Sequence, residues 1–231
     1  MIGIICALSI EVEGLAKLLD NKTENTYAKM KYISGTINGK KVVMTECGIG
    51  KVNAAMSTQV MIDKYNPDVI INSGIAGSVS RTLKIGDIVI SKDCVQHDFD
   101  GTQMGDPKGL IQYNDETRID IPVSEDVANK LYDACKDLDD TNVTLGRIAT
   151  GDIFVADKAM RSAVADEFDA VACEMEGGAV AQVCYRNDVP CAVLRCISDD
   201  FDENDFMDFM QFRFVAADKS MAAIKNFLEL V

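Results

Sequence analysis

Short runs of apolar residues alternate along the chain with segments whose apolar residues recur at helical spacing. Runs of small or branched side chains are typical of buried strands. They predict strands over residues 2–7, 31–36, 41–46, 68–72, 85–97, 143–149, 170–173 and 191–197. Helical spacing predicts helices over about residues 10–19, 52–64, 124–137, 177–186 and 205–230. In a chain of 231 residues, this alternation predicts one α/β domain spanning residues 1–231.

Two of the predicted strands end in acidic residues. The strand over 170–173 runs into Glu174, Met175 and Glu176, and the strand over 191–197 runs into Ser198 and Asp199. The helix between them makes the stretch a strand–helix–strand unit, which we expect to be a right-handed parallel crossover. Ligands of open parallel sheets bind beyond the carboxyl ends of the strands. We therefore expect these acids to face a common site.

Two glycine-bearing turns are candidate ligand contacts. Residues 48–50 precede a helix and could bind a phosphate through backbone amides, or form only a tight turn, since dinucleotide and P-loop signatures are incomplete. Residues 73–78 read as a loop whose Gly74 and Gly77 would let the backbone approach a ligand closely, or as a plain turn. The polar segment 98–120 reads as one long loop, and such loops are typically lids or mobile segments.

The composition of the chain disfavours several classes of binding partner. A net charge of −14 disfavours nucleic acid and anionic membrane surfaces, and the apolar runs fall short of the ~20 residues that cross a bilayer. The N-terminus reads as a first strand rather than a signal peptide. The eight cysteines form no C-x-x-C pair and predict a reduced, cytoplasmic protein without a zinc site. The single histidine, His97, is expected to be structural or to lie behind the residues that contact the substrate, and no metal or other cofactor is expected.

Several motifs occur in a specific order along the chain. They are Glu11 after the first strand, Cys47-Gly-Ile-Gly-Lys-Val52, Asn72-Ser-Gly-Ile-Ala-Gly77, Thr150-Gly-Asp-Ile-Phe154, Glu174-Met-Glu176 and Arg195-Cys-Ile-Ser-Asp199. From residue 2 to the last helix, the chain resembles the 5′-methylthioadenosine/S-adenosylhomocysteine nucleosidases of the purine nucleoside phosphorylase superfamily, with Cys47 in place of a serine. The resemblance implies a central mixed β-sheet flanked by helices, a homodimer, and hydrolysis of the N-glycosidic bond of 5′-substituted adenosines.

The resemblance also implies the catalytic roles. Adenine leaves poorly as an anion, so Asp199 is expected to protonate it at N7, while Glu11 activates a water on the other face of the sugar. Two opposed carboxyl groups follow the logic of an inverting glycosidase. Ser198 and Arg195 would orient and tune Asp199. The plainer alternative for Asp199 is a helix cap or a salt-bridged surface acid.

Further residues are expected to bind the substrate. Glu176 would accept hydrogen bonds from the ribose hydroxyls, with Met175 against the sugar and Glu174 closing the network. Phe154 would stack on adenine, and the backbone of Val155 would read its N1 and N6. The residues expected to complete the site are Ala76 and Gly77 in the glycine-bearing loop, and Leu8, Ile49 and Phe209 around the 5′-substituent. In the loop 98–112, Gly101 and Asp106 replace an expected aliphatic and an expected aromatic residue, which leaves the preferred 5′-substituent open.

Two other functions would use a similar fold or ligand. A nucleoside phosphorylase would need cations for phosphate, but the first turn holds Ser9 and Glu11, and the loop has Asn72 where phosphorylases generally carry arginine and Ile75 where they carry serine or threonine. A non-catalytic adenosine-binding protein would not need Glu11 and Asp199. Hydrolysis is favoured.

The helix over residues 52–62 is apolar on more than one face, which predicts a partner surface. We expect a two-fold dimer in which the loop 98–112 reaches the other subunit's site near Ile49 and Phe209.

Overall fold

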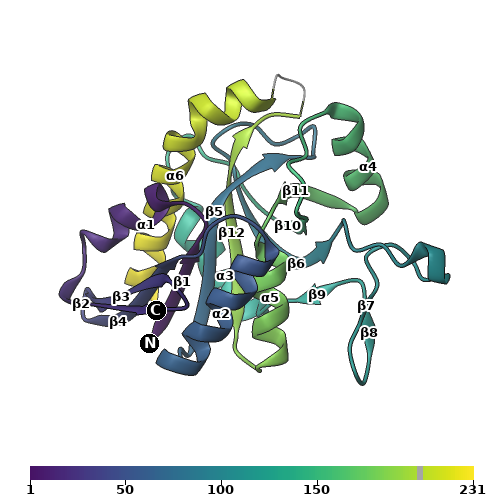
Figure 1. The fold of residues 1–231 in the computed structure, drawn as a ribbon. Coiled ribbons are helices and arrows are strands. Elements are labelled where there is room, and N and C mark those ends of the chain that lie inside the picture. The colour runs from purple at the N-terminus through teal and green to yellow at the C-terminus, as the bar shows by residue number, and fades with distance from the viewer. Residues whose placement is uncertain (202–204) are drawn as a thin grey trace.

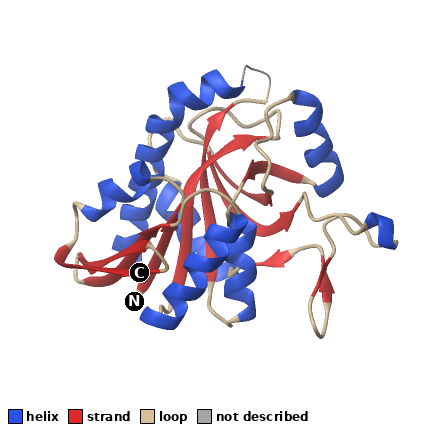
Figure 2. Cartoon of the chain, in the orientation of Figure 1, coloured by secondary structure: helices blue, strands red, loops and turns tan. Residues whose placement is uncertain are grey.

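The computed structural model describes residues 1–201 and 205–231, with side chains from residue 210 onward in the second range. One large mixed sheet forms the centre of the molecule (Figures 1 and 2). Its strands are β1 (Ile2–Cys6), β2 (Asp20–Tyr27), β3 (Met30–Ile37), β4 (Lys40–Glu46), β5 (Val69–Ser78), β6 (Ile88–Gln96), β9 (Ile121–Pro122), β10 (Val143–Thr150), β11 (Ala170–Glu174) and β12 (Cys191–Asp199). They lie in the order β11-β10-β6-β12-β5-β1-β4-β3-β2, and β9 pairs with β6. The predicted α/β class with a central mixed sheet is confirmed.

Helices cover both faces of the sheet. They are α1 (Ser9–Ala16), α2 (Lys51–Tyr65), α3 (Glu125–Cys135), α4 (Lys158–Phe168), α5 (Gly177–Arg186) and α6 (Asp205–Leu230). Helices α1, α3 and α6 pack together on one face, and α2 and α5 pack on the other (Figure 1). Strand β12 alternates between the two cores, because Leu194 faces the first and Val193 faces the second. No helix in the described part of the chain combines the length and apolarity needed to span a membrane.

The far end of β5 shapes the site. Residues 73–78, predicted as a loop, continue the strand instead, because Ser73–Gly77 pair in parallel with Leu194–Asp199 of β12. The last residues of β5, Gly77 and Ser78, also pair antiparallel with Cys173 and Ala172 of β11. Since β11 pairs with β10 as well, these strands close into a ring. The end of β5 therefore lies between the ends of β11 and β12.

The predicted parallel crossover is wrong in its pairing. Strands β11 and β12 are not hydrogen-bonded to each other, and they pair with β5 in opposite directions. Their carboxyl ends still meet, because Gly77 pairs with both Cys173 and Asp199. The expectation that their acids share a site therefore holds for a different topological reason.

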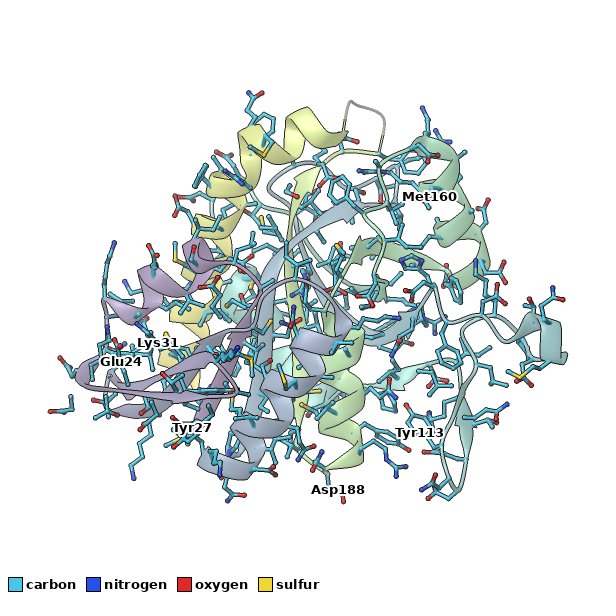
Figure 3. All side chains as sticks on the ribbon, in the orientation of Figure 1. Glu24, Tyr27, Lys31, Tyr113, Met160 and Asp188 are labelled. Atoms are coloured by element: carbon cyan, nitrogen blue, oxygen red, sulfur yellow. The ribbon has the colours of Figure 1, made fainter. Side chains whose placement is uncertain are left out.

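The two longest elements that were not predicted from the sequence are β2 and α4. Strand β2 is almost wholly exposed at the edge of the sheet, where Glu24 forms ion pairs with Lys22 and Lys31 (Figure 3). Helix α4 begins after Asp157, whose carboxylate accepts the backbone N–H of Met160.

The predicted loop 98–120 contains a short 3₁₀ turn (η1, Thr102–Met104) and a hairpin of β7 (Ile111–Gln112) and β8 (Thr117–Arg118), which projects from the body (Figure 1). Helix α1 ends at Ala16, short of the predicted residue 19.

Candidate active site

A cavity of about 120 Å³ lies at the carboxyl ends of β1, β5, β11 and β12. It brings together nearly all of the predicted site residues, namely Glu11, Ile49, Ala76, Gly77, Phe154, Val155, Glu174, Met175, Glu176, Arg195, Ser198 and Asp199. Leu8, also expected near the 5′-substituent, lines it too. The side chain of Phe209 lies outside the described residues. Sequence reasoning did not assign roles to other lining residues that are neighbours of these motifs, namely Ala7, Ser73, Ile153 and Cys173.

Glu11 is a buried carboxyl group in the first turn of α1. Its Oε2 accepts the backbone N–H of Leu8 at 3.0 Å, which is the hydrogen bond of a helix N-cap. Burial raises the pKa of Glu11 to about 7, against the lowering effects of the Leu8 hydrogen bond and the charge of Arg195. A Cβ on Gly74 would lie 3.0 Å from Glu11 Oε1, so the absence of a side chain there leaves that oxygen room. A carboxylate with this pKa can accept a proton near neutrality.

Asp199 ends β12 and is almost fully buried. The Ser198 hydroxyl donates to its Oδ1 at 2.7 Å, and the Arg161 guanidinium on α4 donates to its Oδ2. A Cβ on Gly77 would lie only 2.6 Å from Oδ2, so the glycine is needed for this close approach. This burial is inconsistent with the alternative of a salt-bridged surface acid, although Asp199 does form an ion pair, a buried one with Arg161.

Arg195, which was expected to orient Asp199, instead contacts the acids at the end of β11. Its guanidinium donates to Asn72 Oδ1 at 2.5 Å and forms a buried ion pair with Glu174. Glu174 also accepts the backbone N–H groups of Glu176 and Gly177, at 3.0 and 2.7 Å, at the start of α5. These contacts hold Glu174 in place as part of the scaffold of the site.

Glu176 lines the same cavity and contacts the neighbouring turn. Its Oε1 accepts the backbone N–H of Gly50 at 2.8 Å. Burial, and then the nearby charge of Glu174, raise the pKa of Glu176 to about 7. The group combines hydrogen-bond acceptors with a buried position, as a ligand for sugar hydroxyls requires.

The turn at residues 48–50 does not form a phosphate cradle. The backbone N–H of Gly50 is taken by Glu176, and that of Lys51 by Asp152 Oδ1 at 2.8 Å. The same turn is tied to Asp98, whose Oδ1 lies 2.6 Å from Lys51 Nζ and whose Oδ2 accepts the N–H of Asp152 at 2.8 Å. This Lys51–Asp98–Asp152 network joins the start of α2 to the segment that carries Phe154.

The segment 151–155 forms one wall of the cavity. Phe154 is 44% exposed, so it lies at the opening rather than in the core, while Val155 is buried. His97 packs behind this segment, because a Cβ on Gly151 would lie 2.3 Å from its Nε2. Burial lowers the pKa of His97, which favours the neutral imidazole of a structural residue.

The comparisons with known proteins agree with this site. The model of a family described as the phosphorylase superfamily matches residues 1–229. A 5′-methylthioadenosine/S-adenosylhomocysteine nucleosidase from Shewanella sp. (strain MR-7) is 40% identical over 209 residues, covering 90% of this chain and 87% of that protein. This chain belongs to the 5′-methylthioadenosine/S-adenosylhomocysteine nucleosidase family of that superfamily.

Two solved structures from Helicobacter pylori are similar to this nucleosidase-family chain over its full length. A futalosine hydrolase has a TM-score of 0.93 and 33% identity, covering 100% of this chain and 97% of its own. A mutant nucleosidase with 5′-methylthioadenosine in its active site has a TM-score of 0.93 and 32% identity, covering 100% and 98%. The resemblance inferred from the motifs is therefore confirmed.

Proposed function

We propose that this protein hydrolyses the N-glycosidic bond of 5′-substituted adenosines, with 5′-methylthioadenosine and S-adenosylhomocysteine as substrates. The observation that carries the proposal is the pair of buried carboxyl groups, Glu11 and Asp199, on the wall of one cavity. They come from different elements, α1 and β12, which suits an acid and a base acting on opposite faces of a sugar. The named relatives act on the same class of nucleoside.

The reaction couples two proton transfers to one displacement. Asp199 gives its proton to adenine N7 as the C1′–N9 bond breaks, and Glu11 takes a proton from the water whose oxygen bonds to C1′. Between these events the sugar carries oxocarbenium character, and Glu176 holds its hydroxyls. The products are adenine and a 5-substituted ribose, and solvent returns the two carboxyl groups to their starting states.

The other residues of the cavity contact different parts of the substrate. Phe154 stacks on adenine, the Val155 backbone reads its N1 and N6, and Met175 contacts the sugar. Ala76 and Gly77 bring the backbone of β5 against the nucleoside. Leu8 and Ile49 surround the 5′-substituent.

Phosphate is a poor replacement for water in this cavity. Among the described lining residues, Glu11, Glu174, Glu176 and Asp199 are acidic, and Arg195 is the one cation. Arg195 is already ion-paired with Glu174. A phosphate dianion would meet an excess of negative charge with no unoccupied guanidinium beside it.

Features of the surface and the cysteines support a proposed assembly and location. The chain acts as a two-fold homodimer in which the loop 98–112 covers the partner's site. Exposed apolar side chains support this arrangement on both parts, with Ile49, Val52 and Met56 at α2 and Phe99 and Met104 in the loop. The eight cysteines are free and buried, as in a protein of the reducing cytoplasm.

One assay tests the reaction. Adenine release is measured from methylthioadenosine, adenosylhomocysteine, 5′-deoxyadenosine and inosine, with and without phosphate, and the sugar product is identified by chromatography. We expect free 5-substituted ribose, in a yield that phosphate does not change, and little turnover of inosine. Formation of ribose 1-phosphate would overturn hydrolysis, and absence of any turnover would favour a binding protein.

A further inference from the structure

Arg161 of α4 is a fully buried cation that contacts Asp199 directly. Its side chain is 1% exposed. Its Nη2 donates to Asp199 Oδ2, and its Nη1 donates to the backbone carbonyls of Ser78 and Asp200, both at 2.8 Å. One guanidinium thus joins α4 to the ends of β5 and β12. In Figure 3, the labelled Met160 marks the preceding residue on α4.

The two oxygens of Asp199 are held from different sides. Ser198 donates to Oδ1 and Arg161 to Oδ2, so both torsional freedom and orientation of the carboxyl group are restricted. Gly77 permits this arrangement, because a Cβ there would also lie 3.4 Å from Arg161 Nη2. Asp199 lines the cavity, whereas Arg161 lies behind it and does not.

A buried cation has an electrostatic consequence for an acid that gives up a proton. When Asp199 transfers its proton, a negative charge appears on the carboxylate of a residue that is only 2% exposed. Arg161 faces that charge at hydrogen-bonding distance, and a preorganised cation in a buried site stabilises such a developing charge without reorganising. Removing an arginine from water is unfavourable, and the contacts with Asp199 and two backbone carbonyls offset that cost.

We propose that Arg161 is a positioning residue for Asp199, which fixes its carboxyl group and stabilises the anion left after adenine is protonated. The inference rests on the proposed function, since it assigns Asp199 the role of the acid. It predicts that Arg161 matters only for leaving groups that need a proton.

The experiment compares two substrates in matched variants. Methylthioadenosine needs protonation of its leaving group, whereas a 4-nitrophenyl 5-methylthioriboside releases a stable anion. The variants are Arg161→Met, Arg161→Lys and Asp199→Asn, with Arg147→Met as a control. Arg147 forms a comparable cluster, donating to both oxygens of Asp93 and to the carbonyl of Phe168, away from the cavity.

We expect Arg161→Met to lower kcat for methylthioadenosine by roughly 10²-fold, within the range of a lost acid-catalytic contribution, with KM changed less than about threefold. Its kcat for the nitrophenyl riboside stays within about threefold of wild type. Arg161→Lys, which keeps the charge, recovers part of the loss. Arg147→Met loses thermal stability but keeps both activities.

The outcomes separate the two claims. Equal losses on both substrates, or none on methylthioadenosine, would overturn the role of Arg161. If Arg161→Met does not fold, the same substrate comparison in Arg161→Lys decides, because lysine cannot hold Asp199 and both carbonyls with the same planar geometry. Full activity of Asp199→Asn on methylthioadenosine would instead overturn the proposed function.

Discussion

Glu11 and Glu176 show how burial adapts ordinary carboxyl groups to chemistry near neutrality. Each has its pKa raised to about 7, and in each the largest cause is removal from water. For Glu176 the charge of Glu174 adds to the effect, and Arg195 opposes it. A base with such a pKa is about half ionised at neutral pH, and it is strong enough to take a proton from water.

The first prediction concerns the pH dependence of activity. Because Glu11 must be ionised to accept a proton, kcat/KM for methylthioadenosine should fall on the acid side as the pH drops through about 7. A pH–rate profile between pH 5 and 9 measures this dependence. A profile that stays flat down to pH 5 would contradict the role of Glu11.

The second prediction concerns stability. The pKa of Glu11 rises from 4.5 to about 7 in the folded chain, so the folded state holds more protons in that window. The stability contributed by protonated Glu11 is present below pH 4.5 and is lost as the pH rises through 7. Glu11→Gln removes the cost of the buried charge and should raise the Tm at pH 8 by about 5–10 °C.

Two comparisons check that result. At pH 4.5 the Tm values of wild type and Glu11→Gln should nearly coincide. Glu13→Gln, an exposed change on the same helix, should leave the Tm unchanged at both pH values. Destabilisation by Glu11→Gln at pH 8 would show that the ionised carboxylate makes a net favourable contribution. The same variant should lose hydrolysis by about 10²-fold or more.

At the residue scale, the sequence predicted the site residues that belong to motifs. It missed a residue that only the fold brings close to the site. Glu11, Glu176 and Asp199 stand in recognisable patterns, and they line the predicted cavity. Arg161 had no such signal, since an arginine on a helix is usually solvated. It is buried only because the ends of β5 and β12 converge on α4.

At the scale of elements, the strands and helices that could be predicted are those with a clear apolar pattern in the sequence. Strands with buried apolar runs were found, whereas β2, with the sequence Asp-Asn-Lys-Thr-Glu-Asn-Thr-Tyr, has no apolar alternation and forms by pairing with β3 at the edge. The end of β5 is rich in glycine, serine and alanine, residues with little strand preference. Its pairing with β12 and β11 imposes the strand, which is a tertiary effect.

A third prediction tests how elements cooperate at the opening of the cavity. The Lys51–Asp98–Asp152 network fixes the segment 151–155 against the start of α2. Lys51→Met should therefore raise the KM for methylthioadenosine by about tenfold, with kcat changed less. The reason is that the segment which positions adenine is no longer fixed, while the carboxyl groups stay in place. Lys64→Met, at the far end of the same helix, is the control and should leave both constants unchanged. A fall in kcat with an unchanged KM would contradict a role of the network in binding adenine.

At the scale of the whole molecule, helix α2 exposes apolar side chains on one face. Ala54 and Met61 are buried against the sheet, whereas Val52 is 76% exposed. The fourth prediction is that this face forms a dimer interface burying on the order of 2,000 Å² or more. Val52→Glu should shift the chain toward monomer in light scattering and reduce activity. Leu230→Glu, at an exposed apolar position near the end of α6, should do neither.

The last prediction asks whether the dimer shares its sites. Asp199→Asn damages a subunit's own cavity, whereas Met104→Asp would damage the loop that it supplies to its partner. In a mixed dimer, one cavity then carries both defects and the other carries neither. Unfolding and refolding the two weakly active variants together should give mixed dimers in about half of the population, and so about a quarter of wild-type activity per chain. Activity no higher than the average of the separate variants would show that each subunit completes its own site.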